Sequence, residues 1–368
     1  DLIQDPHKML DEVNGRRFQV RRYLDEGKTL DCREPDRCQH CFIEPFCNTV
    51  DNTVEAQHEG RFDTWWVADV EAAKAAVSTL PFGCTRVGFP IESADQLGDH
   101  EALLNAAMVV RPSDAGLPPE TLTGPIVLVA HSAEQLESWM PVAGLSLRIE
   151  LNRDTAEWMK QHKSDVAARM HDLHIHQPSH EKMLAAVERD VRDPVTFFEA
   201  LNLPVRVSGL PACMAPGATL VDDPADLPAH LFDEATGRLD IRPLARHHIA
   251  SKYRGKSVRC ADCRVTDRCE GIHINMVRDQ GLRQAQPLIE GAWADEAERQ
   301  LIARWPKPPV RVHHGRNAQP ASPSLPGFAQ PDAAPADPLA VIAREVAQKA
   351  AARKAKRAAM RKKLEAGS

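Results

Sequence analysis

The chain has 368 residues, of which 43% are hydrophobic and 27% charged, and its formal net charge is −6. This length corresponds to two or three domains, and this composition is that of a globular protein, which excludes collagen-like and wholly disordered chains. No apolar run approaches the roughly 20 residues that a bilayer-spanning helix needs. No signal-peptide pattern follows the first residue, Asp1. We therefore expect a cytoplasmic protein with no membrane segment. The chain does not start at Met, and whether an N-terminal part precedes it stays open.

The first 212 residues divide into a helical start and a segment of alternating strands and helices. We expect a helix over 1–31, then a cysteine-rich segment over 32–50 without regular period, which together form a first unit, 1–59. Candidate strands in 60–212 are Thr64–Ala68, Thr85–Phe89, Ala106–Arg111, Ile126–Ala130, Leu145–Glu150, Leu173–Gln177 and Val205–Ser208. Helical runs lie between them at Val70–Leu80, Ala133–Met140 and Asp154–Met170. This alternation predicts an α/β fold with βαβ units and a partial (β/α) barrel.

The remaining residues are predicted to form three units. Residues 213–305 hold a second cysteine-rich segment and end in a helix over 291–305. The stretch 306–338 contains nine prolines and is expected to be a disordered linker, because proline cannot donate a backbone hydrogen bond. The last 30 residues, 339–368, contain nine Lys or Arg against two Glu. They predict a basic helical tail that contacts nucleic acid or an acidic partner, or that is simply solvated.

Seven of the nine cysteines lie in two short segments. The first reads Cys32-x5-Cys38-x2-Cys41-x5-Cys47 and the second reads Cys260-x2-Cys263-x5-Cys269. The motif Cys-x2-Cys-x5-Cys therefore occurs twice, at a constant offset of 222 residues, and an arginine precedes each copy. We expect these arginines, Arg37 and Arg259, to hydrogen-bond the bound centre or to balance its negative charge. Such a repeat is improbable by chance, so the sequence predicts two metal or cluster sites.

Two thiolates separated by two residues converge on one centre, and a third thiolate, after five further residues, lies on the next loop. Structural zinc sites use paired Cys-x2-Cys hooks or Cys/His combinations. Three grouped cysteines with one distant cysteine fit an iron–sulfur cluster better. Disulfides are rare in the cytosol, and three thiols per segment would leave one unpaired. We favour an iron–sulfur cluster at each site and keep zinc as the alternative.

Each site needs a fourth ligand. Cys213, in a Pro-flanked loop after a predicted strand, is our candidate for the second site. Cys32 is close enough to serve the first site. However, the repeat offset would place the equivalent of Cys213 before residue 1, so the fourth ligand of the first site stays open. Cys84 lies between a helix and a strand and is expected to be a buried small apolar side chain.

The stretch Lys252–Leu288, KYRGKSVRCADCRVTDRCEGIHINMVRDQGLRQAQPL, resembles the C-terminal auxiliary-cluster region (SPASM or twitch domain) of radical SAM proteins. In that family Cys-x2-Cys-x5-Cys is followed by glycine, a short helix, another glycine and a Leu/Pro ending. The preceding LPACMAPG resembles the loop that supplies the remaining cysteine. The resemblance implies a partial barrel flanked by two [4Fe–4S] clusters. The ligands would be Cys32, Cys38, Cys41, Cys47, Cys213, Cys260, Cys263 and Cys269.

The resemblance is incomplete. The signature Cys-x3-Cys-x2-Cys of the family, whose cluster binds S-adenosylmethionine, is absent from the sequence. Three explanations stay open. The catalytic half precedes Asp1, the chain is a degenerate homologue, or Cys32-x5-Cys38-x2-Cys41 is a variant of the catalytic motif.

The resemblance implies that the chain supports reductive cleavage of S-adenosylmethionine and radical modification of a peptide or small molecule. The cofactor would be bound through a region outside this chain, and a flavodoxin or ferredoxin would supply electrons. The alternative, from another class, is a zinc-stabilised binding module whose basic tail contacts nucleic acid. The acidic body of the chain disfavours broad nucleic-acid binding, which requires a basic face.

Four histidines, His171, His174, His176 and His180, lie in or near one predicted strand. His174 and His176 are two residues apart and would share one face of that strand. They predict a metal or proton-transfer site, or merely a polar strand end. Strand ends of βα folds carry functional sites, so His176 is a secondary candidate. Trp65 and Trp66 are expected in the core, with stacking on a substrate as the alternative, and His247 and His248 are expected at the surface.

Overall fold

The computed structural model describes residues 5–28, 30, 32–38, 41–305 and 321–328. Asp1–Gly327 form one compact unit. The predicted basic helix over 339–368 and most of the predicted linker lie outside the described residues. No helix among the described residues is long and apolar enough to cross a membrane.

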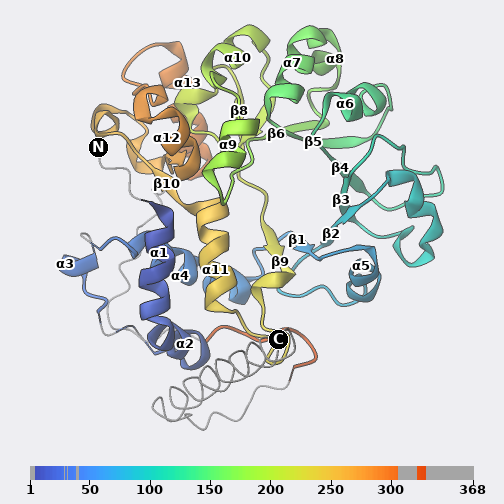
Figure 1. The fold of residues 1–368 in the computed structure, drawn as a ribbon. Coiled ribbons are helices and arrows are strands. Elements are labelled where there is room, and N and C mark those ends of the chain that lie inside the picture. Colours follow the sequence, from blue (N-terminus) through green and yellow to red (C-terminus); the bar gives the residue numbers. More distant parts are fainter. Residues whose placement is uncertain (1–4, 29, 31, 39–40, 306–320, 329–368) are drawn as a thin grey trace, which may run out of the picture. The chain divides into compact units, whose positions relative to one another are not determined.

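The centre of the fold is a curled parallel sheet of nine strands (Figure 1). The strands are β1 (Thr64–Trp66), β2 (Arg86–Ile91), β3 (Met108–Pro112), β4 (Ile126–Ala130), β5 (Ser146–Glu150), β6 (Leu173–His176), β7 (Arg206–Ser208), β8 (Thr219–Leu220) and β9 (Asp226–Pro228). Their order in the sheet is β8-β7-β6-β5-β4-β3-β2-β1-β9, and every neighbouring pair is parallel. The prediction of an α/β fold with a partial parallel barrel is confirmed.

Apolar strands and capped crossover helices explain this architecture. Val87, Phe89, Val110 and Leu128 are completely buried, as expected for parallel strands covered by helices. The crossover helices are α5 (Val70–Ala76), α6 (Ala133–Trp139), α7 (Arg153–Gln161), α8 (Lys163–Arg169), α9 (Met183–Arg189) and α10 (Pro194–Leu201). In four of them the side chain of the N-cap residue accepts a hydrogen bond from a backbone N–H group in the first turn. These N-cap residues are Asp69 (α5), Ser132 (α6), Asn152 (α7) and Asp193 (α10). Such caps satisfy donors that a helix start leaves unpaired.

A short connection forces the sheet to curl. Residues 221–225 join β8 at one edge of the sheet to β9 at the other edge. An extended chain covers at most about 3.6 Å per residue, so Leu220 and Asp226 lie within about 20 Å of each other. A flat sheet of this size would separate its edges by almost twice that distance, because neighbouring strands are about 4.8 Å apart. The two edges therefore face each other across a concave interior.

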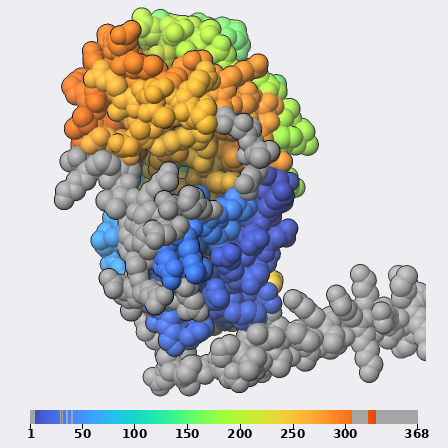
Figure 2. Space-filling model, turned by 90° about the vertical axis from the view of Figure 1, so that its left-hand side faces the viewer, coloured from blue at the N-terminus to red at the C-terminus, as the bar shows by residue number. Residues whose placement is uncertain are grey.

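The two cysteine-rich segments consist of helices and turns, one segment before the first strand of the sheet and the other after its last strand. The N-terminal helices are α1 (Pro6–Gly15), α2 (Arg17–Glu26), α3 (Pro35–Cys38) and α4 (Glu44–Glu59). The C-terminal elements are α11 (Ile241–His247), a π-helical turn (His248–Lys252), β10 (Arg254–Gly255), β11 (Ile272–His273), α12 (Ile274–Gln280) and α13 (Ala292–Arg304). Figure 2 shows parts of both segments exposed on one face of the molecule, in blue and orange.

Two expectations from the sequence need correction. The cysteine-rich segment 32–50 is not irregular throughout, because α4 starts at Glu44 within it. Residues 321–325, expected to belong to the disordered linker, pack on the rest of the unit. The Ser322 backbone N–H donates to the Leu24 carbonyl (2.7 Å), and its buried hydroxyl donates to Gln57 Oε1 (3.0 Å). Proline blocks its own N–H, but it does not prevent neighbouring residues from donating theirs.

Gly88 on β2 makes room for the Trp66 indole and provides a test of this packing. A Cβ atom at residue 88 would lie 2.6 Å from Trp66 Cδ2 and 2.8 Å from Thr64 Cγ2. We expect Gly88→Ala to lower the free energy of unfolding by about 1–3 kcal/mol, because overpacking displaces neighbours. Urea denaturation measures this loss. Gly15→Ala is the control, since a Cβ there meets nothing within 4 Å. Equal midpoints for both variants would contradict the tight contact.

Candidate functional site

The first four cysteines, Cys32, Cys38, Cys41 and Cys47, form what we call the first quartet. Cys38 ends α3 and Cys47 lies in the first turn of α4. Between them the Cys41 backbone N–H donates to the Cys38 carbonyl at 2.8 Å. This turn brings the two thiols of Cys-x2-Cys to one side of the chain. All four thiols line a single cavity of about 290 Å³.

Three arginines also line this cavity: Arg16, Arg33 and Arg37. Arg16 Nη1 donates to Cys32 Sγ at 3.6 Å. Arg33 is 6% exposed, and its guanidinium is fixed by an ion pair with buried Asp51. The sequence singled out Arg37 as a charge that balances the thiolates. The structure adds Arg16 and Arg33, which come from other positions in the chain.

Burial favours the protonated form of two thiols of the first quartet, Cys38 and Cys47. It raises the pKa of Cys47 to about 12, although Arg33 counteracts part of that effect. Burial likewise raises the pKa of Cys38 above its usual value. A metal centre bound here would therefore displace protons from these thiols, since thiolates are the metal ligands.

The second quartet consists of Cys213, Cys260, Cys263 and Cys269. Cys213 lies in a 3-10 turn (Ala212–Met214) that follows β7, and the other three lie on turns between β10 and β11. Burial raises the pKa of Cys213 to about 12, and the neighbouring thiols of Cys269, Cys263 and Cys260 raise it further. The fold thus places Cys213 beside the three cysteines from which it is separated by more than forty residues of sequence.

Backbone N–H groups point at two sulfur atoms of the second quartet. The Gly271 N–H donates to Cys269 Sγ and the Leu288 N–H donates to Cys263 Sγ, both at 3.3 Å. Such hydrogen bonds stabilise thiolate charge and tune metal–sulfur sites. Arg259, expected to balance the thiolate charge, donates instead to the carbonyls of Leu282 and Arg283.

Neither quartet is arranged around a single ion. Among the described residues, no three His, Cys, Asp or Glu side chains are placed to hold one metal ion. A [4Fe–4S] cluster has a different requirement, because each of its four irons takes one cysteine. Its thiols surround a space rather than converge on a point. In the first quartet, all four cysteines line one cavity.

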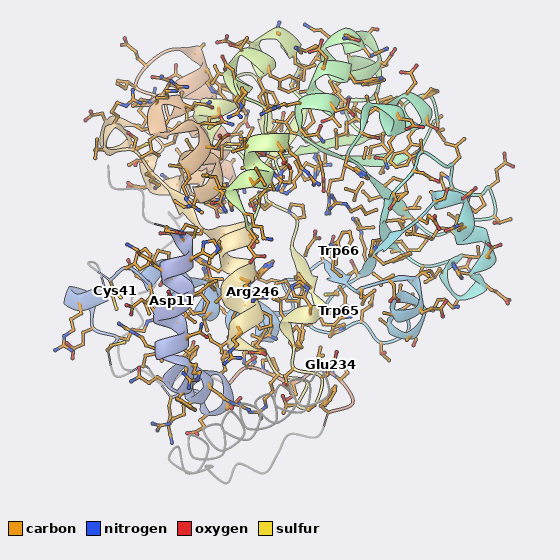
Figure 3. The ribbon with its side chains drawn as sticks, in the orientation of Figure 1. Asp11, Cys41, Trp65, Trp66, Glu234 and Arg246 are labelled. Atoms are coloured by element: carbon orange, nitrogen blue, oxygen red, sulfur yellow. The ribbon has the colours of Figure 1, made fainter. Side chains whose placement is uncertain are left out.

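A third feature is the cavity inside the half-barrel, of about 310 Å³. It lies at the carboxyl ends of the strands, where βα folds carry their functional sites. Its polar lining residues are Trp66, Arg111, Arg148, Glu150, His176, Gln177, Ser179, Asp223, Asp226, His247, Ser251, Lys252 and Arg254. Trp65 and Trp66, labelled in Figure 3, lie on opposite faces of β1. Trp65 is in the core as expected, whereas Trp66 lines this cavity.

Ion pairs organise the interior of this cavity. Arg111 Nη2 contacts Glu150 Oε2 at 2.8 Å. Arg148 on β5 reaches Asp226 on β9, also at 2.8 Å, although four strands separate them in the sheet. This contact is possible because the sheet curls. Buried charges require such partners, since an isolated charge in a low-dielectric interior is strongly destabilising.

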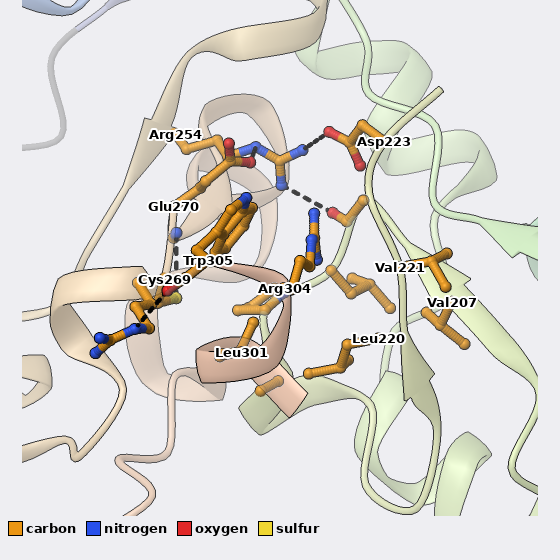
Figure 4. A pocket seen from close by; sticks show the side chains of 16 residues that line it. Val207, Leu220, Val221, Asp223, Arg254, Cys269, Glu270, Leu301, Arg304 and Trp305 are labelled. Carbon is orange, nitrogen blue, oxygen red and sulfur yellow. Dashed lines mark hydrogen bonds and ion pairs between the residues drawn. The ribbon is translucent and has the colours of Figure 1, made fainter. Parts of the chain in front are cut away.

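Arg254 connects the half-barrel cavity with the second quartet (Figure 4). Its Nη2 contacts Asp223 Oδ2 at 2.8 Å, and its Nη1 donates to the Gly209 carbonyl at 2.9 Å. Its Nε lies 3.4 Å from Glu270 Oε2, and Glu270 directly follows Cys269. Although burial alone would raise it, the pKa of Asp223 is lowered to about 2 by Arg254, with contributions from His176 and Lys252. Asp223 is therefore ionised at neutral pH.

The four histidines do not form one site. His174 and His176 share a face of β6, and each shares a hydrogen bond with Ser208 Oγ, at 2.8 and 2.9 Å. Burial lowers the pKa of His174 to about 3, and the His176 ring lowers it further. His180 lies instead 3.0 Å from Asp190, and His171 is exposed. His176 is the member of the group that lines the half-barrel cavity.

The sequence-based expectation for Cys84 is confirmed, and that for His248 is wrong. Cys84 is buried, as expected, and belongs to neither quartet. His248 is 1% exposed rather than at the surface, because the π-helical turn packs against α4, where Phe46 and Thr49 contact the imidazole ring. The arginines and carboxylates of the half-barrel were missed. Their signal is a charged residue within an apolar strand, as with Arg111 in MVVRP and Arg148 in SLRIE.

Comparisons with known proteins give no relative: no protein-family model, no curated protein and no solved structure matches this chain.

Buried His248 predicts acid sensitivity of the fold. Burial lowers its pKa from 6.5 to about 3, helped by His247 and Lys252. Below pH 6.5 the unfolded chain binds a proton that the folded chain does not, so the free energy of unfolding falls as the pH decreases. Above pH 6.5 this histidine contributes no pH dependence.

Urea denaturation at pH 7.5 and pH 5.5 measures this effect. We expect the loss of stability between the two pH values to be about 1.4 kcal/mol smaller in His248→Gln than in the wild type. His171→Gln is the matched control and should leave the difference unchanged, because that ring is exposed to solvent. An identical pH dependence in His248→Gln and the wild type would contradict the assignment.

Proposed function

We propose that this chain binds two [4Fe–4S] clusters, one on each quartet, and acts as the electron-transferring part of a radical SAM-type system. The observation that carries the proposal is the first quartet, in which four thiols and three arginines line one cavity. Four cysteine thiolates are the ligand set of such clusters. The arginines offset the negative charge that a thiolate-bound cluster carries.

The second quartet supports the same assignment. It repeats the Cys-x2-Cys-x5-Cys spacing, and Cys213 supplies a fourth thiol next to the other three. Two of its sulfur atoms accept backbone N–H groups. Both quartets are attached to the half-barrel unit and would act as its iron–sulfur segments. Iron–sulfur clusters bound there would supply one-electron chemistry.

The half-barrel indicates which part of the reaction this chain would perform. In the family that the sequence resembles, the motif that binds S-adenosylmethionine lies at the end of the first barrel strand. Val67–Asp69, which follow β1, contain no cysteine, and Cys32-x5-Cys38-x2-Cys41 lies between α2 and α4 rather than at a strand end. A motif that binds and cleaves S-adenosylmethionine would therefore come from outside this chain. Under this proposal the chain receives electrons from a flavodoxin or ferredoxin and supports radical modification of a peptide or small molecule.

Metal analysis of anaerobically purified and reconstituted protein tests the proposal. We expect about eight iron and eight sulfide per chain, with the broad visible absorption of iron–sulfur clusters. A colourless protein that holds two zinc ions and no sulfide would contradict it and support the zinc-stabilised binding module instead.

Cysteine variants test the assignment of each quartet. Cys213→Ala should remove about half of the iron by disrupting the second site, and Cys47→Ala should remove the other half. Cys84→Ala is the control, because Cys84 does not line the cavity of the first quartet and its charged neighbours are Asp63 and Asp226 rather than other cysteines. Iron content, sulfide content and electron paramagnetic resonance of the reduced protein provide the readouts. Unchanged iron in Cys213→Ala would refute its role as a ligand.

A further inference from the structure

The three arginines that line the cavity of the first quartet differ in their access to solvent. The side chains of Arg16 and Arg37 are 34% and 69% exposed, whereas that of Arg33 is 7% exposed. Glu44, the carboxylate on the same lining, is also partly exposed. Water screens exposed charges, and a buried charge acts through a lower dielectric. Arg33 is therefore the charge on this lining with the strongest effect on the thiols.

A buried network holds the Arg33 guanidinium in place. Its Nη2 forms an ion pair with Asp51 and donates to Asn48 Oδ1 at 3.3 Å. Asp51 is 2% exposed, and its Oδ1 accepts the Tyr23 hydroxyl at 2.6 Å. Tyr23 lies on α2, and Asn48 and Asp51 lie on α4. The guanidinium cannot turn away from the cavity without breaking its contacts with α4.

The ion pair presents its positive end to the first quartet. Arg33 lines the cavity, and Asp51 does not. The effects on the thiols have the corresponding sign. Burial raises the pKa of Cys47, Arg33 counteracts that effect, and Asp51 adds to it by a smaller amount. Burial also raises the pKa of Cys38, and Arg33 is among the groups that lower it. The pair therefore acts on the thiols as a fixed dipole whose positive charge is the closer one.

We infer that the buried ion pair of Arg33 and Asp51 raises the reduction potential of the first site, with Arg33 as the charge that tunes it. The inference rests on the proposed function, since it concerns the cluster proposed for that site. On reduction the site gains one electron from the flavodoxin or ferredoxin of that proposal, so its reduced form carries one more negative charge. A fixed positive charge nearby stabilises the reduced form more than the oxidised form.

The second quartet has a different charge arrangement. Its buried arginine, Arg254, contacts two carboxylates, Asp223 and Glu270, rather than one. Arg259, which precedes Cys260, is exposed and donates to backbone carbonyls. The tuning by Arg33 is therefore specific to the first site, and a substitution of Arg33 is expected to leave the second site unaffected.

Redox titration monitored by electron paramagnetic resonance tests the inference on the full, reconstituted chain. The Cys213→Ala background isolates the first site, and the Cys47→Ala background isolates the second. At a fixed potential, Arg33→Met should lower the ratio of reduced to oxidised first site about tenfold, which is about 59 mV for one electron. It should not change the midpoint of the second site. Arg33→Lys keeps the charge and should retain most of the wild-type potential.

A double variant separates the dipole from the net charge. Arg33→Met combined with Asp51→Asn removes both charges, so the net charge stays the same and no buried charge lacks a partner. The ratio should still fall at least about threefold, because the positive end of the pair is closer to the thiols. Arg61→Met is the matched control, since Arg61 is half exposed, pairs with Glu55 and Glu59, and does not line the cavity. It should titrate as the parent chain does.

Iron, sulfide and circular dichroism are measured on every preparation, so that the inference and the proposed function fail separately. An unchanged midpoint of the first site in iron-loaded Arg33→Met or in the double variant would overturn the inference alone. Loss of the first cluster from the folded double variant would also overturn it, because the pair would then build the site rather than tune it. A folded wild-type chain without iron and sulfide would overturn the proposed function, and this inference with it.

Discussion

The connection between the two edges of the sheet is the constraint on which the rest of the structure depends. Residues 221–225 are too few to cross a flat sheet of nine parallel strands. The curl that they impose brings Arg148 of β5 to Asp226 of β9 and encloses the cavity at the carboxyl ends of the strands. Asp223, within this connection, also contacts Arg254. One short segment therefore shapes the interior and joins it to the second quartet.

The interior is polar because its charges occur in fixed pairs. Each lining arginine has a carboxylate at 2.8 Å, and such pairing offsets part of the desolvation penalty of both charges. Paired charges hold each other in place, so the charged side chains that line the cavity are preorganised. Arg254 extends this frame to Glu270 and hence to the neighbour of Cys269. A change of charge in the cavity would therefore change the electrostatic potential at the second quartet.

Local sequence signals were enough to predict most of the sheet. The seven expected strands all occur, because Val- and Ile-rich runs between helices indicate parallel strands regardless of their partners. The missed strands, β8 (Thr219–Leu220) and β9 (Asp226–Pro228), are two and three residues long. Such short strands lack a periodic pattern and exist because the curled sheet offers them an edge to pair with. Residues 321–325 were misjudged for a related reason, since their partners lie far away in sequence.

The candidate sites show the same division between local and long-range information. The spacing of Cys-x2-Cys-x5-Cys is local, so the sequence could single out both cysteine segments. The proximity of Cys213 to the second segment depends on where β7 ends. Its place in a loop after a predicted strand made Cys213 a candidate ligand, but the sequence did not show that this loop lies beside the other three cysteines. Arg33 and Arg254 could not be recognised, because they lie in polar stretches of the sequence, where a buried arginine cannot be told from an exposed one. Their roles arise from the low-dielectric surroundings that the fold creates, where a fixed charge acts much more strongly than in water.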